Sequence, residues 1–219
     1  LPCFKHVRDL PAPPDAVFLA VPREAAIECI GDLRDMGAGG LVCYTAGFGE
    51  TGGAGAKAEE ALIEAAGDLA LVGPNCYGVI NYHRGLALWP FAHGGHHPGF
   101  GAAIVTQSGM FSSDLTMSQR SLPLSYMVSA GNQLVLRLED FVDAFIDKDH
   151  VRAIGLHIEG LPDPAGFEKV ALRALARDIP IVAFKTGSSQ IGSQLTISHT
   201  GPMSGTDKTY SAFFDRLGI

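Results

Sequence analysis

The fold is decided by the stretch Ala102-Ala103-Ile104-Val105-Thr106-Gln107-Ser108-Gly109, an apolar run followed by a short polar turn. The apolar run is typical of a buried strand, and residues 110–120 suit a helix. Free backbone amides and the helix dipole at such a junction can bind phosphate. The structural alternative is that Ser108 is an N-cap and Gly109 a packing residue. The residues alone favour neither a phosphate site nor a purely structural turn, and Ser108 can serve in both roles.

Strands and helices alternate on both sides of this junction. Apolar runs that suit strands lie at residues 16–21, 40–44, 69–72, 125–128, 153–158 and 181–184. Segments that suit helices lie at residues 23–36, 56–66, 138–146, 164–177 and 205–217. This alternation predicts an α/β fold with parallel sheets and right-handed crossovers. Residues 82–100 interrupt it and are predicted to form an irregular interdomain connection.

The turns that follow the early strands are candidate binding segments, because ligands of parallel sheets bind at the carboxyl ends of strands. Three such ends are Val21-Pro22, Tyr44-Thr45-Ala46-Gly47 and Gly73-Pro74-Asn75. Each offers backbone amides or a small polar group, although each taken alone is also an ordinary tight turn. No GxGxxG motif follows the first strand, so we expect the chain to start after the opening part of a dinucleotide-type unit.

A histidine among small residues is the candidate for chemistry. The segment Ser198-His199-Thr200-Gly201 follows a run rich in serine and glycine, and small neighbours leave an imidazole accessible. Neutral imidazole is nucleophilic near neutral pH. Glu159 ends a predicted strand at the same sheet edge as the turn at Gln107-Ser108-Gly109 and the loop of His199. Together they suit a histidine that accepts a phosphoryl group, with Glu159 holding its tautomer. The alternative is an ordinary histidine of a surface loop.

Composition excludes some classes of partner. The formal net charge is −7 and the basic residues are scattered, which argues against nucleic acid or an anionic membrane as a main partner. No apolar run reaches the ~20 residues of a membrane span. Four cysteines without CxxC spacing indicate reduced thiols in a cytoplasmic protein. The group His93, His96 and His97 lacks a neighbouring carboxylate or cysteine, so we expect no metal site.

Several segments, in the same order, resemble the NDP-forming acyl-CoA synthetases of the succinyl-CoA synthetase superfamily, most of all the ADP-forming acetyl-CoA synthetases. Each motif is weak alone, but their number and order cover nearly the whole chain. The segments that carry the resemblance are Gly73-Pro74-Asn75-Cys76-Tyr77-Gly78-Val79-Ile80-Asn81, Thr106-Gln107-Ser108-Gly109, Ser129-Ala130-Gly131-Asn132, His157-Ile158-Glu159-Gly160, and Ser198-His199-Thr200-Gly201 with Gly205-Thr206-Asp207.

The resemblance implies two domains. Residues 1–98 would be a partial Rossmann-like CoA-binding domain without its first strand–helix–strand part. Residues 99–219 would be a flavodoxin-like ligase domain with a parallel sheet, lacking its C-terminal end. We therefore expect a fragment or one subunit of a larger enzyme.

The resemblance also implies the roles of single residues. His199 matches the phosphorylated histidine, and Glu159 matches the glutamate that pairs with it. The turn Gln107-Ser108-Gly109 matches the helix start that holds the phosphate. Tyr44-Thr45-Ala46 and Asn75 match the neighbourhood of the CoA pantetheine and thiol.

The implied reaction interconverts acyl-CoA, NDP and phosphate with acid, CoA and NTP through a phosphohistidine at His199. The resemblance implies CoA and a carboxylic acid as substrates, with no cofactor tightly bound to this chain. ATP or ADP and Mg²⁺ would bind to an ATP-grasp domain or subunit outside it, and we expect an oligomer. One alternative is a non-enzymatic module that senses CoA or acyl-CoA within a larger protein, such as a protein acetyltransferase. Another is a flavodoxin-like binding domain whose motifs are coincidental.

Overall fold

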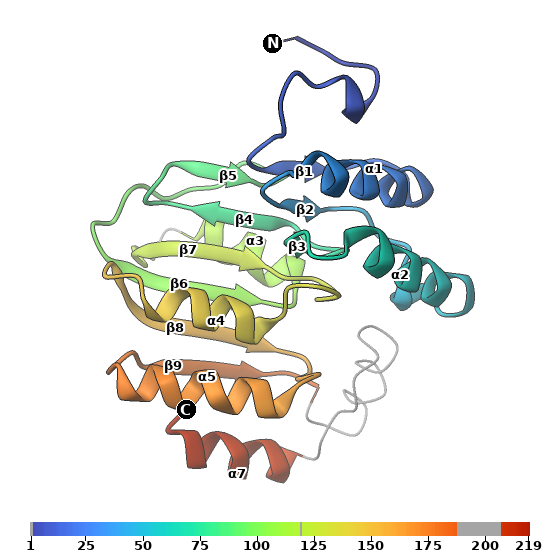
Figure 1. Ribbon diagram of the computed structural model, residues 1–219. Helices are drawn as coiled ribbons and strands as arrows, with labels where there is room; N and C mark the ends of the chain where they lie inside the picture. The colour runs from blue at the N-terminus through green and yellow to red at the C-terminus, as the bar shows by residue number, and fades with distance from the viewer. Residues whose placement is uncertain (1, 119, 188–206) are drawn as a thin grey trace.

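The computed structural model describes residues 2–118, 120–187 and 207–219. Two sheets lie beside each other (Figure 1). The smaller sheet is parallel and has the order β1-β2-β3. Its unit comprises η1 (Val7–Asp9), β1 (Val17–Leu19), α1 (Arg23–Met36), β2 (Leu41–Cys43), η2 (Gly49–Thr51), α2 (Gly53–Ala66) and β3 (Leu71–Val72).

Helix α1 shows how local sequence builds this unit. It buries Ala26, Ile30 and Leu33, whose spacing places them on one helical face. It ends at Gly37, whose φ of 79° lies in the left-handed region that favours glycine. Near its end the Arg34 guanidinium donates to the backbone oxygens of residues 64 and 65, so α1 is tied to the C-terminal turn of α2.

The larger sheet has the strand order β5-β4-β7-β6-β8-β9. Its strands are β4 (Gly78–Asn81), β5 (Leu86–Leu88), β6 (Gly101–Thr106), β7 (Leu124–Ser129), β8 (Val151–Ile158) and β9 (Ile181–Lys185). Its helices are α3 (Gly109–Met117), α4 (Leu138–Ile146), α5 (Pro164–Ala176) and α7 (Asp207–Leu217). Figure 1 shows α4 and α5 in front of the sheet and α3 behind it. The α/β fold with parallel strands β7-β6-β8-β9 is therefore confirmed.

Two strands of this sheet were not predicted. β4 pairs with β7 in antiparallel register from Gly78↔Ser129 to Asn81↔Tyr126, and β5 pairs antiparallel with β4. The prediction of an irregular connection over residues 82–100 was therefore wrong at β5. Both strands are very short, and the partner of β4 lies about fifty residues away in sequence, so no local pattern marks them.

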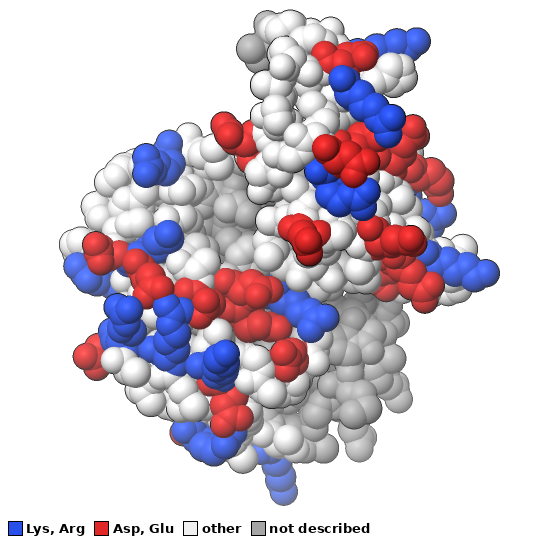
Figure 2. Space-filling view, in the orientation of Figure 1, with Lys and Arg blue, Asp and Glu red and all other residues white. Residues whose placement is uncertain are grey.

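Charged residues on the face shown in Figure 2 are mixed in sign. Over α4 and α5, Arg173 pairs with both Asp143 and Asp147, and Arg177 also pairs with Asp147. Exposed pairs of this kind contribute little to stability, about 0–1 kcal/mol each. None of the helices in the described part of the chain is long and apolar enough to cross a bilayer.

The four cysteines are free thiols. Burial raises the pKa of the Cys43 thiol to about 11 and also raises the pKa of Cys76. The Cys76 thiol contacts the backbone oxygen of Cys43 at 3.4 Å, between the ends of two strands of the smaller sheet. Both thiols therefore stay protonated at neutral pH and act as small core side chains.

Candidate functional site

The start of α3 is held in place by hydrogen bonds of the turn that follows β6. Ser108 is the N-cap, and its hydroxyl oxygen accepts a hydrogen bond from the amide of Phe111 at 3.3 Å. The Ser108 amide donates to the hydroxyl of Thr106 at 3.0 Å. Within the described residues, the amides of Gly109 and Met110 form no hydrogen bond, and the first turn of α3 has no acidic side chain. This helix start can bind an anion and act as an N-cap at the same time.

Gln107 has a role that the sequence did not indicate. Its side-chain oxygen accepts hydrogen bonds from the amides of Glu159 at 2.5 Å and Gly160 at 3.0 Å. Its side-chain nitrogen donates to the backbone oxygen of Gly160 at 2.7 Å. The side chain is buried, so all its polar atoms are used inside the protein. Gln107 thereby fixes the loop after β8 against the end of β6.

The backbone of Glu159 is held from a second side by Lys185. The Lys185 ammonium donates to the backbone oxygen of Glu159 at 2.9 Å and also to that of Thr186. It lies 4.7 Å from the ring centroid of Tyr210, at a distance suited to a cation–π contact. Gln107 and Lys185 thus set the place of Glu159 through its main chain.

His157 is a buried group that the sequence analysis did not assign. Its ring nitrogens lie 3.0 Å from the Thr106 hydroxyl and 3.3 Å from the Thr186 hydroxyl. Its ring stacks on Phe111 with centroids 4.9 Å apart. Burial first, and then the charge of Lys185, lower the pKa of His157, so the imidazole stays neutral near pH 7. It connects the N-cap region of α3 with the start of the segment after β9.

The turn after β2 and the turn after β3 are bonded together. The Thr45 hydroxyl donates to the backbone oxygen of Val21 at 2.6 Å, and the Asn75 amide donates to the backbone oxygen of Thr45 at 2.9 Å. Tyr44 is partly buried, whereas Ala46 and Asn75 are exposed. The segments that follow β1, β2 and β3 are thus bonded to one another and form one surface.

Asn132 joins this surface to the larger sheet. Its side-chain oxygen accepts from the Asn75 side chain at 3.2 Å, and its side-chain nitrogen donates to Glu50 at 2.6 Å. Glu50 also accepts hydrogen bonds from the amides of Gly47 and Phe48. Burial alone would raise the pKa of Glu50, but the hydrogen bonds from Asn132 and these amides outweigh it and lower the pKa. A charged carboxylate therefore organises the glycine-rich loop after β2.

Gly131 allows the two loops to approach so closely. Its φ is +59°, and a Cβ at this position would overlap the backbone oxygen of Pro74 and lie 2.7 Å from that of Asn75. The neighbouring Asn132 amide donates to the Pro74 oxygen at 2.9 Å, and the Leu134 amide donates to the Gly73 oxygen at 3.2 Å. Only glycine fits this contact without strain.

Tyr77 reaches from the carboxyl ends of the smaller sheet to the start of α3. A Cβ placed on Gly109 would lie 3.0 Å from the Tyr77 ring, so the ring covers this side of the first helical turn. The Tyr77 ring also contacts Tyr44, at 6.3 Å between centroids, and the Tyr77 amide donates to the Ser129 hydroxyl at 3.0 Å. The candidate CoA residues and the candidate phosphate residues are thus joined at one sheet edge.

The comparison with family models agrees with this arrangement. Residues 100–219 match the succinyl-CoA ligase like flavodoxin domain, and residues 1–82 match a CoA binding domain. The chain belongs to the succinyl-CoA-ligase-like family. The resemblance inferred from the motifs is therefore confirmed.

Known members of the succinyl-CoA-ligase-like family align over the full described fold. The α subunit of an ADP-forming acetate–CoA ligase II from Pyrococcus furiosus is 32% identical over 99% of this chain and 47% of its own length. A trans-feruloyl-CoA synthase from an unknown prokaryotic organism is 33% identical over 100% of this chain and 32% of its own length. The chain thus spans less than half the length of these relatives.

A solved structure of the family shows the same fold. It is the dinucleotide forming acetyl-coenzyme A synthetase 1 of Candidatus Korarchaeum cryptofilum, in complex with phosphate and ADP. Its TM-score is 0.88 at 28% identity, over 100% of this chain and 47% of that chain. An α/β fold with a CoA-binding unit followed by a flavodoxin-like unit is therefore confirmed as the fold class.

His199, the expected phosphorylated residue, lies outside the residues that the structure describes. The structure thus places Glu159, Ser108 and Gly109 at one edge, together with the candidate CoA residues, but not their expected histidine partner. His157, Asn132 and Tyr77 belong to the same edge and were not predicted as site residues. Their only sequence signal is that each lies within a family-like motif.

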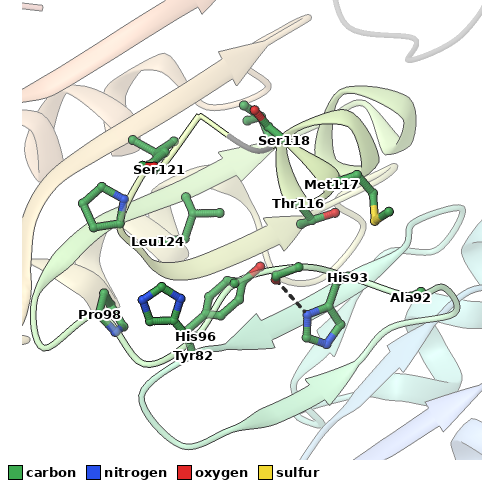
Figure 3. A pocket seen from close by; sticks show the side chains of 15 residues that line it. Tyr82, Ala92, His93, His96, Pro98, Thr116, Met117, Ser118, Ser121 and Leu124 are labelled. Carbon is green, nitrogen blue, oxygen red and sulfur yellow. Dashed lines mark hydrogen bonds between the residues drawn. The ribbon is translucent and has the colours of Figure 1, made fainter.

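The succinyl-CoA-ligase-like unit has a separate cavity of about 650 Å³ at its opposite edge (Figure 3). It lies between residues 92–98, the end of α3 and the start of β7. In Figure 3, His93 and His96 lie on opposite sides of Tyr82. Among the described residues, no group of three or more His, Cys, Asp or Glu side chains is placed to hold a metal ion.

Proposed function

We propose that this chain is the CoA-binding and phosphohistidine part of an NDP-forming acid–CoA ligase. The observation that carries the proposal is the junction between the two candidate subsites. Asn75 binds Asn132, and the Tyr77 ring lies against Gly109, so the expected CoA surface directly adjoins the expected phosphate site. An acyl thioester and a phosphate would have to meet at this place for the reaction.

On the CoA side, we propose that Tyr44, Thr45, Ala46 and Asn75 contact the pantetheine end of CoA. Ala46 and Asn75 are exposed, which suits contact with a substrate. The Glu50 carboxylate and Asn132 hold the loop behind them in one conformation. Because the loop is bonded before CoA arrives, less conformational entropy is lost on binding.

On the phosphate side, an oxygen of inorganic phosphate would attack the thioester carbonyl. The carbon–sulfur bond breaks, CoA leaves as the thiol, and an acyl phosphate is formed. A nitrogen of His199 would then attack phosphorus, which releases the carboxylate and leaves phosphohistidine. Transfer of that phosphoryl group to NDP gives NTP and frees the imidazole. The amides of Gly109 and Met110, which have no hydrogen-bond partner among the described residues, and the hydroxyl of Ser108 suit the phosphoryl group in each state.

Glu159 would accept a hydrogen bond from the other imidazole nitrogen of His199, fixing its tautomer and stabilising its protonated form. Gln107 would contribute indirectly, as a positioning residue, because its amide holds the Glu159 backbone. Lys185 and His157 support the same region through their contacts with Glu159 and Thr106.

The nucleotide, with Mg²⁺, would be bound by an ATP-grasp domain or subunit that acts together with this chain. We propose a cytoplasmic, oligomeric enzyme, in line with the α-subunit name of the Pyrococcus relative. The relatives named above act on different acids by their names, acetate and ferulate, so the identity of the acid does not follow from family membership.

The proposal is tested by phosphorylation of the full protein with its nucleotide-binding partner and γ-labelled ATP. We expect acid-labile, base-stable label on the wild-type chain and on the control His96→Ala, an exposed histidine. We expect no label on His199→Ala. We expect at least ~100-fold slower labelling on Ser108→Ala, because its hydroxyl is proposed to bind the phosphoryl group. Binding of CoA without any label would overturn the ligase proposal and support the sensing module.

A further inference from the structure

Tyr77 is in contact with three other aromatic rings. Its ring centroid lies 4.8 Å from that of Phe91 and 5.8 Å from that of Trp89, both in edge-on geometry. The Tyr44 ring lies 6.3 Å away in a tilted arrangement. Tyr77 thus takes part in three ring contacts while its ring also lies against Gly109. The Tyr77 ring therefore occupies the space beside Gly109, and no further side chain fits there while it stays in this position.

The place of this ring matters because it lies between two parts of the proposed site. Tyr44 belongs to the proposed CoA surface, and Gly109 belongs to the proposed phosphate site. An acyl group joined to the CoA thiol and attacked by phosphate must occupy the space between them. The side chain that bounds this space therefore limits the size of the acyl group.

The backbone at Tyr77 is held by a hydrogen bond that does not involve its ring. The link from this segment to β7 is made by the Tyr77 amide, which donates to the Ser129 hydroxyl. The side chain is only partly buried, and its neighbour Phe91 is 45% exposed. A smaller side chain at residue 77 would leave this hydrogen bond intact and open a space bounded by aromatic walls.

We infer that Tyr77 determines specificity, restricting the acid to small aliphatic carboxylates by filling the space beside the first turn of α3. The inference rests on the proposed ligase function. In the Tyr77→Ala variant, Tyr44, Trp89 and Phe91 would form the walls of a site for an aryl acid. A hydrophobic wall of this kind discriminates between acids through transition-state binding, by factors of ~10–200 for small size differences.

The test measures kcat and KM of the full enzyme, with its nucleotide-binding partner, for acetate and for phenylacetate. We expect wild type to prefer acetate. In Tyr77→Ala, we expect the ratio of kcat/KM for phenylacetate to that for acetate to rise at least ~10-fold, mainly through a lower KM for phenylacetate. Tyr77→Phe keeps the ring and should keep the wild-type ratio. Phe100→Ala removes a 59% exposed ring outside this cluster and serves as the matched control.

Two outcomes would overturn the inference: an unchanged ratio in Tyr77→Ala, or a wild-type enzyme that already prefers phenylacetate. If Tyr77→Ala does not fold, as judged by circular dichroism, Tyr77→Leu fills part of the space and should shift the ratio in the same direction. Labelling of His199 separates the two proposals. Normal label with an unchanged ratio rejects the role of Tyr77 alone, whereas absent label in wild type rejects the proposed function.

Discussion

The two edges of the larger sheet differ in how their loops are held. At the carboxyl edge, Gln107 uses its whole side-chain amide and Glu50 accepts three hydrogen bonds. At the amino edge, the Tyr82 hydroxyl and a ring nitrogen of His83 are buried without a hydrogen-bond partner among the described residues. The carboxyl edge has two such atoms as well, in the Trp89 ring and the Glu139 carboxylate. Each such unpaired group costs about 1–3 kcal/mol.

The comparison shows where the fold holds its geometry most tightly. The carboxyl edge joins two units of the chain and holds the residues proposed for chemistry, and its loops are fixed by several bonds each. The amino edge has a cavity and a group of closely spaced imidazoles instead. His83 and His150 lie with ring centroids 3.6 Å apart, and His97 lies 4.5 Å from His83. We expect substitutions at the carboxyl edge to have the larger effects.

The largest effect should come from Gly131→Ala, which breaks the contact between the two loops. The added Cβ would overlap the Pro74 oxygen, and alanine at a φ of +59° is strained. We expect a loss of roughly 3 kcal/mol of unfolding free energy, measured by urea denaturation. Gly85→Ala is the matched control, since Gly85 has the same φ but no atom within 4 Å of an added Cβ. It should lose about 1–2 kcal/mol. Equal losses would show that the loop contact contributes nothing.

A smaller loss should follow from Gln107→Leu. This change leaves the buried amide and oxygen of Gly160 and the amide of Glu159 without their partner. We expect a loss of about 2–3 kcal/mol and slower phosphorylation, because Lys185 alone then holds the Glu159 backbone. Gln133→Leu removes another buried glutamine, whose side chain accepts one bond from Leu138, and should cost about 1 kcal/mol. A larger loss for Gln133→Leu would contradict this account.

The smallest expected effect is a pH dependence of the unfolding free energy that arises from histidines at the amino edge. Burial is the main cause that lowers the pKa of His83, and the charge of His97 adds to it. Burial is also the main cause that lowers the pKa of His150, and the charges of His83, Lys148 and His97 add to it. Asp149 opposes the shift, and the Tyr126 hydroxyl lies 2.9 Å from His150.

As pH falls below the unfolded value of about 6.5, the unfolded chain binds protons before the folded chain does. Stability should therefore decrease from about pH 6.5 downwards, until the lowered folded pKa values are passed. Urea midpoints between pH 7 and pH 5 should fall less in His83→Gln than in wild type. His96→Gln, which changes an exposed histidine of the same segment, should follow wild type, and identical slopes in all three would refute the linkage.

Much of the fold could be predicted from local pattern. The bounds of α1 and α4 agree with the predicted ranges, because apolar spacing and a terminal glycine or turn mark them. β4 and β5 could not be predicted, since a four-residue and a three-residue strand acquire their identity from pairing with β7 and with each other. Tertiary partners decide such segments.

The candidate site also has one part that sequence could indicate and another that depends on tertiary contacts. Ser108, Gly109 and Glu159 could be proposed as site residues because they directly follow strands of a parallel sheet, a rule that depends on chain order alone. The contacts of Gln107 and the position of His157 could not be predicted, because they depend on which side chain of a strand faces which loop. Tyr77 lay within a recognised motif, but only the three-dimensional arrangement shows its ring against Gly109.

The pairing of β4 with β7 also has a practical consequence for dissecting the molecule. A recombinant piece that began at residue 99 would lack β4 and would present β7 as an unprotected outer strand. Such edges recruit other chains and promote aggregation. A piece cut ahead of Gly78 instead would retain the strand that shields β7, so the boundary suited to expression lies before β4.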